Sequence, residues 1–144
     1  MPILRSVTIE TATPRESAPR RVLVADDQAS TRRFLRAVLE ELPDLDVIGE
    51  AVDGMETVAQ VQALQPDIVL LDLSMPVFDG SDAIAGILRV KPDASVVIVS
   101  GMDPEYGDPL VGPGVLGFVW KGLPPFELLE RLRDILTPEG SAAR

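Results

Sequence analysis

From residue 21 onward, short apolar runs alternate with longer segments in which apolar residues recur every three or four positions. The short runs predict strands at 21–25, 46–51, 67–72, 94–100 and 115–120. The longer segments predict helices at 29–42, 55–64, 81–90 and 124–136. Because strands that alternate with helices form βαβ units, we expect an α/β fold in which a parallel sheet carries helices on both faces.

The segment 101–115 interrupts this alternation. A helix is due there, but the segment is rich in prolines and glycines: Pro104, Gly107, Pro109, Gly112, Pro113 and Gly114. Inside a helix each proline costs about 3 kcal/mol and each glycine about 1 kcal/mol relative to alanine. We therefore expect at most one or two helical turns, near 103–110.

The first 20 residues show no sustained period and are rich in threonine, serine and proline, which predicts a disordered N-terminal arm. A short strand at 3–9 is the one regular element that their pattern allows. A chain of 144 residues is too short for two domains of ordinary size. We therefore expect a single domain at 21–137, followed by a C-terminal tail at 138–144.

The composition excludes several kinds of chemistry. With no cysteine and no histidine, the chain has no disulfide, thiolate nucleophile, zinc–thiolate site, histidine base or phosphohistidine of its own. The net charge of −10 argues against direct contact with nucleic acid, which requires clustered basic side chains. Because no run reaches about 18 apolar residues and no signal segment is present, we expect a soluble cytoplasmic protein that does not enter a membrane.

Five polar side chains stand at the ends of the predicted strands. They are Asp26 and Asp27 just after the first strand, Asp72 at the end of the third, Ser100 at the end of the fourth and Lys121 just after the fifth. Because the carboxyl ends of parallel strands share one edge of a sheet, we expect these side chains to meet there. Taken singly, an aspartate after a strand is more often a helix N-cap, a serine a turn former and a lysine a solvated charge.

Three carboxylates at one edge of a sheet repel one another. Two carboxylates about 4 Å apart at an effective dielectric constant near 20 oppose each other by roughly 4 kcal/mol. Such a cluster stays ionised only beside cations; otherwise the pKa values of its members rise. Lys121 supplies one positive charge, and a hard divalent cation with oxygen ligands, Mg²⁺, is the natural second.

Four motifs, VLVADDQ, DIVLLDLSMPVFDG, VVIVSG and GFVWKG, follow one another at the spacing of a known family. Together they resemble the receiver domain of two-component response regulators, the CheY-like family, over residues 21–136. The stretch ELPDLDVIGEAVDGMETV resembles receivers joined to LuxR-type DNA-binding domains. The resemblance implies a flavodoxin-like, doubly wound sheet of five parallel strands in the order 2-1-3-4-5; in this chain the fourth helix is expected to be shortened or irregular.

The resemblance also implies a role for each residue that follows the third, fourth and fifth strands. Asp72 would be the phosphoacceptor and form an aspartyl phosphate. Ser100 would donate its hydroxyl to a phosphoryl oxygen. Lys121 would pair first with the acceptor carboxylate and then with the phosphoryl group.

The same resemblance implies a Mg²⁺ site. Asp27 would bind the ion directly and Asp26 largely through water. Asp72 and the backbone carbonyl of Ser74 would complete the protein's share of the ligands.

Two residues near Lys121 depart from the usual receiver pattern. Most receivers place a proline, often after a cis peptide bond, where this chain has Gly122. We expect a trans bond, because a cis bond before a residue other than proline costs about 2.5–4 kcal/mol. The switch aromatic is Phe118 instead of the frequent tyrosine. Both ordinary core packing and a switch by repacking stay open for this residue.

Two interpretations also stay open for the segment 101–115: a switch between an ordered and a disordered state, and a plain loop.

The function that the resemblance implies is signalling, with no enzymatic activity beyond self-phosphotransfer and autodephosphorylation. A sensor histidine kinase or phosphotransfer protein would supply the phosphoryl group, and a downstream effector protein would respond. Two alternatives stay open: the receiver half of a LuxR-type DNA-binding regulator whose output domain is absent from this chain, and a phosphorylation-independent pseudo-receiver. A homodimer also stays open. An aspartate-nucleophile phosphatase would need a second acid where this chain has Ser74.

Overall fold

The computed structural model describes residues 18–76 and 80–137. The predicted arm, the allowed strand at 3–9 and the predicted tail at 138–144 lie outside the described residues, apart from the last residues of the arm. Each predicted strand is present, within a residue or two of its predicted bounds. They are β1 (Arg20–Ala25), β2 (Leu45–Ala51), β3 (Ile68–Leu71), β4 (Ser95–Ser100) and β5 (Val115–Trp120).

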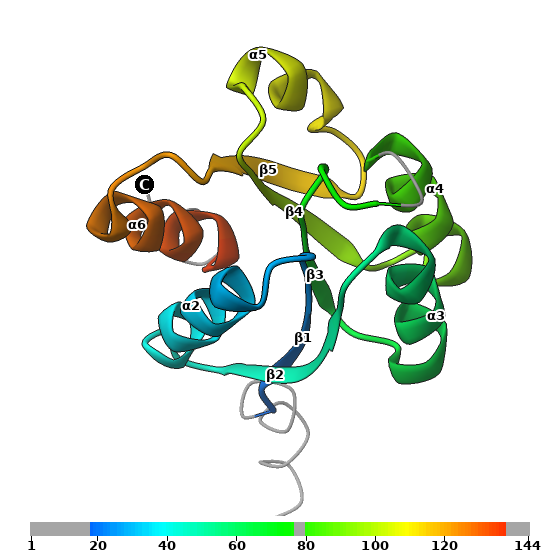
Figure 1. Cartoon of the computed structure of the whole chain (residues 1–144). Helices are drawn as coiled ribbons and strands as arrows, with labels where there is room; N and C mark the ends of the chain where they lie inside the picture. Colours follow the sequence, from blue (N-terminus) through cyan, green and yellow to red (C-terminus); the bar gives the residue numbers. More distant parts are fainter. Residues whose placement is uncertain (1–17, 77–79, 138–144) are drawn as a thin grey trace, which may run out of the picture.

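The five strands form one parallel sheet in the order β2-β1-β3-β4-β5, as predicted (Figure 1). β3 lies in the middle of the sheet and all four of its side chains are buried, because helices cover both faces. Its run Ile68–Leu71 is therefore apolar at every position, because side chains on both faces of the strand are covered by helices. Asp67 and Asp72 stand just outside the two ends of this strand.

Two helices cover each face of the sheet. The helices are α2 (Ala29–Glu40), α3 (Gly54–Leu64), α4 (Gly80–Val90) and α6 (Pro125–Leu136). Figure 1 shows α2 and α6 on one side of the sheet and α3 and α4 on the other. Each pair closes a separate core: Leu39 and Leu132 belong to the first, and Val61 and Ile87 to the second. No helix in the described ranges is long and apolar enough to cross a membrane.

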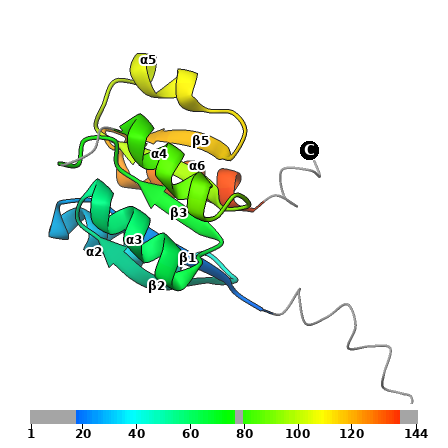
Figure 2. The same cartoon turned by 90° about the vertical axis from the view of Figure 1, so that its right-hand side faces the viewer.

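The segment after β4 contains the shortened helix that its prolines and glycines predict. α5 spans only Pro104–Gly107, and a 3-10 turn, η2, follows at Asp108–Leu110. The Asp103 side chain accepts a hydrogen bond from the Glu105 N–H at 2.9 Å, and Pro104 stands in the first turn, where its missing N–H costs nothing. In both views α5 lies beside β5, the edge strand of the sheet (Figure 1 and Figure 2).

Candidate functional site

Backbone hydrogen bonds extend the sheet by one residue past the ends of the strands. The Asp26 N–H donates to Ala51 O at 3.0 Å, and the Asp72 N–H donates to Ala25 O at 3.0 Å. The Lys121 N–H donates to Ser100 O at 2.8 Å. Asp26, Asp72 and Lys121 are therefore fixed in the register of the sheet, and their side chains leave from the same edge.

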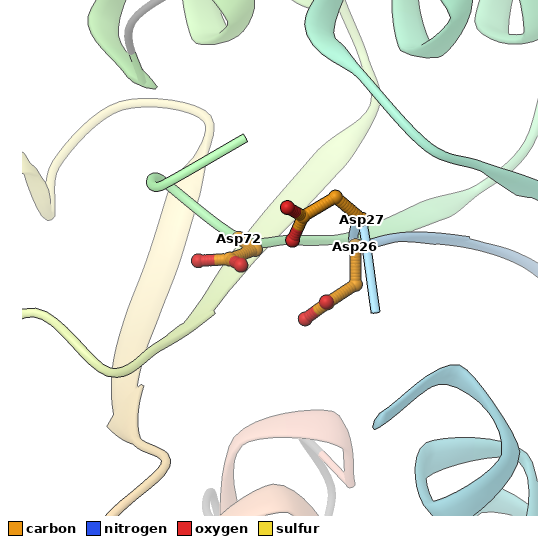
Figure 3. Close-up of side chains that lie close together, drawn as sticks. All are labelled: Asp26, Asp27 and Asp72. Atoms are coloured by element: carbon orange, nitrogen blue, oxygen red, sulfur yellow. The ribbon is translucent and has the colours of Figure 1, made fainter. Parts of the chain in front are cut away.

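Three carboxylates converge at this edge. Asp26 and Asp27 follow β1 and Asp72 follows β3, and each offers one oxygen within 4.8 Å of the others (Figure 3). Asp26 is 1% exposed and Asp72 4% exposed, whereas Asp27 is open to solvent. The site therefore has a buried floor of two acids and an accessible third.

Asp72 is held by donors on both of its carboxylate oxygens. Its Oδ1 accepts hydrogen bonds from the Ser100 hydroxyl and from the Ser74 N–H, each at 3.0 Å. Its Oδ2 accepts from Lys121 Nζ at 3.1 Å. The Ser100 Oγ also accepts from the Met102 N–H at 3.2 Å, so the serine hydroxyl is oriented towards Asp72. A buried carboxylate with this many donors has a fixed orientation.

Lys121 lies between the two buried acids. Its Nζ is 2.6 Å from Asp26 Oδ2 and 3.1 Å from Asp72 Oδ2. Burial disfavours the charged lysine, but its close contacts with the Asp26 and Asp72 carboxylates outweigh this effect and raise the pKa of Lys121. Burial, with the charge of Asp72 added to it, raises the pKa of Asp26, although Lys121 and the Gln28 N–H act in the opposite direction.

The arrangement fits a hard divalent cation. All three acids offer oxygen ligands, and one lysine leaves three carboxylates undercompensated. The buried Oδ2 of Asp26 is at ion-pair distance from Lys121 but accepts no hydrogen bond of regular geometry from the described residues. A cation beside Asp26, Asp27 and Asp72 would satisfy that oxygen and reduce the repulsion among the three carboxylates.

Three predicted features lie around this centre. Ser74 is exposed and its N–H bonds Asp72; metal binding by its carbonyl stays a prediction. Phe118 belongs to β5 and is buried in the core that α3 and α4 cover; its switching role likewise stays a prediction. No peptide bond in the described ranges is cis, so the bond between Lys121 and Gly122 is trans, as predicted.

Sequence reasoning missed one contributor, Arg32. This residue of α2 precedes no strand and follows none, but its Nη1 donates to the Asp26 carbonyl at 2.8 Å. Its Nε donates to Glu50 at 2.6 Å, and the second oxygen of Glu50 accepts from Arg36 at 2.6 Å. Arg32 therefore ties the loop after β1 to the end of β2. The pairing follows from β1 and β2 being neighbours, which the helical period of α2 does not reveal.

Comparisons with known proteins agree with this geometry. The family described as the response regulator receiver domain matches residues 22–133. The chain is 36% identical over 114 residues to the transcriptional regulatory protein LiaR of Bacillus subtilis (strain 168), covering 78% of this chain and 54% of LiaR. It is 32% identical over 117 residues to the chemotaxis protein CheY of Thermotoga maritima, covering 81% of this chain and 97% of CheY.

A solved structure shows the same arrangement of elements. The two-component response regulator of the LuxR family from Aurantimonas sp. SI85-9A1 superposes with a TM-score of 0.73 at 27% identity, covering 84% of this chain and 87% of that one. The chain spans about half the length of the transcriptional regulators that it matches. The acidic triad is typical of a receiver Mg²⁺ site. With its family match, its sheet order and its acidic pocket in agreement, the chain belongs to the response regulator receiver domain family.

Proposed function

We propose that this chain is a phosphorylation-controlled signalling module in which Asp72 accepts the phosphoryl group. One observation carries the proposal: the buried Asp72 carboxylate is bonded by the Ser100 hydroxyl and the Lys121 ammonium, and two further acids lie beside it. A receiver domain is a phosphoacceptor and not a true enzyme. The chemistry needed is therefore one transfer onto Asp72 and, later, its hydrolysis.

In the transfer, one carboxylate oxygen of Asp72 attacks the phosphorus of a phosphodonor in line with the bond that breaks. A phosphorus–oxygen bond forms, and the donor's nitrogen or oxygen leaves with the electron pair. Lys121, now 3.1 Å from Asp72, is close enough to pair with the oxygens of the transferred group. The Ser100 hydroxyl, now donating to Asp72 Oδ1 at 3.0 Å, can turn to the same group.

Asp26, Asp27 and Asp72 are the side chains that would hold Mg²⁺, with the backbone carbonyl of Ser74 as a further ligand. When bound, the ion supplies positive charge against the phosphoryl oxygens. Arg32 supports the loop on which Asp26 and Asp27 stand, through its bond to the Asp26 carbonyl. That support limits how far the loop moves when the charge of the site changes.

None of the 144 residues is a histidine, so the phosphoryl group has to reach Asp72 from outside this domain. A receiver domain implies a histidine kinase as partner, and we propose a phosphohistidine of such a kinase, or of a phosphotransfer protein, as donor. A downstream effector protein would respond to the phosphorylated form.

A second candidate is that this receiver serves a LuxR-type transcription regulator. Two comparisons favour it: the identity with LiaR and the superposition on a response regulator of the LuxR family. The chain spans about half of LiaR, which is consistent with a receiver joined to an output domain. In that case the effector is the DNA-binding half of the same polypeptide.

The experiment uses a small phosphodonor, acetyl phosphate, and intact-mass analysis of the full chain. With Mg²⁺ present, the wild type is expected to gain one phosphoryl group, and chelation of Mg²⁺ should prevent the gain. Asp72→Asn should gain none. Asp67→Asn, at the opposite end of β3, is the matched control and should behave as the wild type does. A wild type without an adduct would overturn the proposal and favour a receiver that signals without phosphorylation.

A further inference from the structure

We propose that Trp120 is a positioning residue for Lys121: its indole packs over Gly122 and holds the turn that delivers the lysine to the acidic site. The inference deepens the proposed function and rests on it, because Lys121 matters there as the partner of Asp72 and of the phosphoryl group. Trp120 itself touches no reacting atom and acts through the residues that follow it.

A tight turn follows the end of β5. Trp120 is the last residue of β5, and the Leu123 N–H donates back to Trp120 O at 3.1 Å. Lys121 and Gly122 are therefore the two central residues of a four-residue turn. The start of the turn is anchored, because the Lys121 N–H donates to Ser100 O at 2.8 Å. The direction of the Lys121 side chain then depends on how the rest of the turn is held.

The indole of Trp120 lies directly against Gly122. A Cβ atom placed on Gly122 would lie only 2.6 Å from Cε2 and from Cη2 of Trp120. Real Cβ atoms do not approach other heavy atoms so closely, so the ring occupies the space of a side chain at position 122. Gly114 is the one glycine with positive φ in the described ranges. The backbone of Gly122 therefore does not require glycine, but the indole does.

This contact explains the residue that follows the lysine. A proline at position 122 would also carry a Cβ, and it would collide with the same ring atoms. In this chain the packing of the Trp120 ring against Gly122 restricts the turn. A proline at position 122 would instead restrict it through its own fixed φ angle. Trp120 and Gly122 form a matched pair, in which each residue is acceptable because of the other.

The indole also borders a groove on its other side. Trp120 is 40% exposed, and it lines a groove of about 480 Å³ with Phe118 and Leu123. The other walls of the groove come from α5, η2 and α6, which flank the end of β5 (Figure 1). The ring is therefore placed between the groove and Gly122. Loss of the ring removes the packing that covers Gly122 and leaves the turn free to move.

A small movement of this turn has a large chemical effect. Lys121 Nζ makes contacts of 2.6 Å and 3.1 Å with two carboxylates. A displacement of about 1 Å in a group that positions reacting atoms can cost roughly a hundredfold in rate. Removal of the indole is therefore expected to slow phosphoryl uptake while the fold is retained.

The main test measures phosphoryl uptake from acetyl phosphate in the full chain, for the wild type, Trp120→Ala, Lys121→Ala and the double variant. Trp120→Ala should slow uptake by about ten- to a hundredfold, and it should cause no further loss once Lys121 is alanine. An unchanged rate in Trp120→Ala, or an equal loss in both backgrounds, would overturn the inference. Trp120→Leu, which keeps an apolar residue at the end of β5, provides a folded variant if alanine does not.

A second pair of variants tests the steric match. Gly122→Ala should slow uptake in the wild type, because the new methyl group displaces the indole. In the Trp120→Ala background the same change should have little effect, because the ring is gone. An equal effect of Gly122→Ala in both backgrounds would contradict the proposed packing.

A spectroscopic measurement separates failure of this inference from failure of the proposed function. The chain has only two lysines, Lys91 and Lys121. Lysine labelled with ¹³C at the ε-carbon therefore gives two NMR signals, and Lys91→Arg assigns them. Trp120→Ala should shift the Lys121 signal and leave the Lys91 signal in place. If no phosphoryl adduct forms but this shift occurs, the positioning role stands and the phosphorylation proposal fails. An unshifted Lys121 signal would refute the positioning role whether or not an adduct forms.

Discussion

The Nζ atom of Lys121 lies closer to Asp26, at 2.6 Å, than to the proposed phosphoacceptor Asp72, at 3.1 Å. One lysine is thus shared between Asp26 and the proposed acceptor, Asp72. Mg²⁺ would compete with Lys121 for the carboxylate of Asp26, so each cation is expected to weaken the binding of the other there. At the phosphoryl group both cations would pair with oxygens and act in the same direction.

Replacement of Lys121 by methionine should expose this competition. Without metal, the variant leaves two buried acids without a cation, and we expect it to lose about 1–3 kcal/mol of unfolding free energy. Added Mg²⁺ should stabilise the variant more than the wild type, because no ammonium competes for Asp26. Urea unfolding with and without Mg²⁺ measures both effects. Lys91→Met, at a lysine paired with the exposed Asp93, should respond to Mg²⁺ as the wild type does; an equal response in Lys121→Met would contradict the competition.

The raised pKa of Asp26 predicts a pH dependence of stability. Chiefly because of burial, Asp26 binds a proton more readily in the folded protein than in the unfolded chain, where the pKa of this carboxyl is near 3.8. The stability linked to that proton is fully present below 3.8 and is lost as the pH rises through the raised pKa. In metal-free buffer, the wild type should therefore lose stability relative to Asp26→Asn over that range. Thermal melts across pH would show this, and a constant difference between the two proteins would contradict it.

Glu50 predicts the opposite pH dependence. The hydrogen bond from Arg36, and to a lesser extent that from Arg32, lowers the pKa of Glu50 against the effect of its partial burial. The stability from these contacts is present above 4.5, the ordinary value, and is lost as the pH falls through the lowered pKa. Glu50→Gln should cost at most about 1 kcal/mol at neutral pH, because the group is partly exposed. The cost should shrink in acid when urea unfolding is measured across pH, and a cost that stays constant as the pH falls would contradict the role of these contacts.

Gly86 lets α4 pack closely against α3. A Cβ at this position would lie 2.7 Å from Cγ2 of Val58, so Gly86→Ala is expected to destabilise the fold by about 1 kcal/mol despite its better helix propensity. Val58→Ala removes the obstacle, and the double variant should be more stable than the sum of the two single changes predicts. Gly112→Ala, where a Cβ meets nothing within 4 Å, is the control. Strict additivity at Gly86 and Val58 would contradict the close packing.

Much of the fold could be predicted because local patterns and the sheet agree. The run Ile68–Leu71 is apolar at every position because both of its faces are covered, and this is visible in the sequence. One end was misplaced: α2 stops at Glu40, although the apolar period continues to Leu42. The Leu42 side chain is buried and its N–H bonds Leu39 O in a tighter turn. The apolar period therefore predicted the burial of Leu42 correctly and the end of the helix incorrectly.

The site was predictable for its residues and not for its contacts. Strand ends identified Asp26, Asp72 and Lys121 because parallel strands finish at one edge. The preference of Lys121 for Asp26, and the packing of Trp120 over Gly122, depend on side-chain orientations that leave no periodic signal. The roles of the individual site residues remain predictions that the experiments above address.

The central claim, that Asp72 carries the phosphoryl group, is tested most directly by locating the modification. Borohydride reduces an acyl phosphate to an alcohol, so a phosphorylated aspartate becomes homoserine, which peptide mass analysis can assign. After treatment with acetyl phosphate and Mg²⁺, we predict homoserine at position 72 and aspartate at positions 26 and 27. Homoserine at either of those two positions, or unmodified aspartate at 72, would contradict the account.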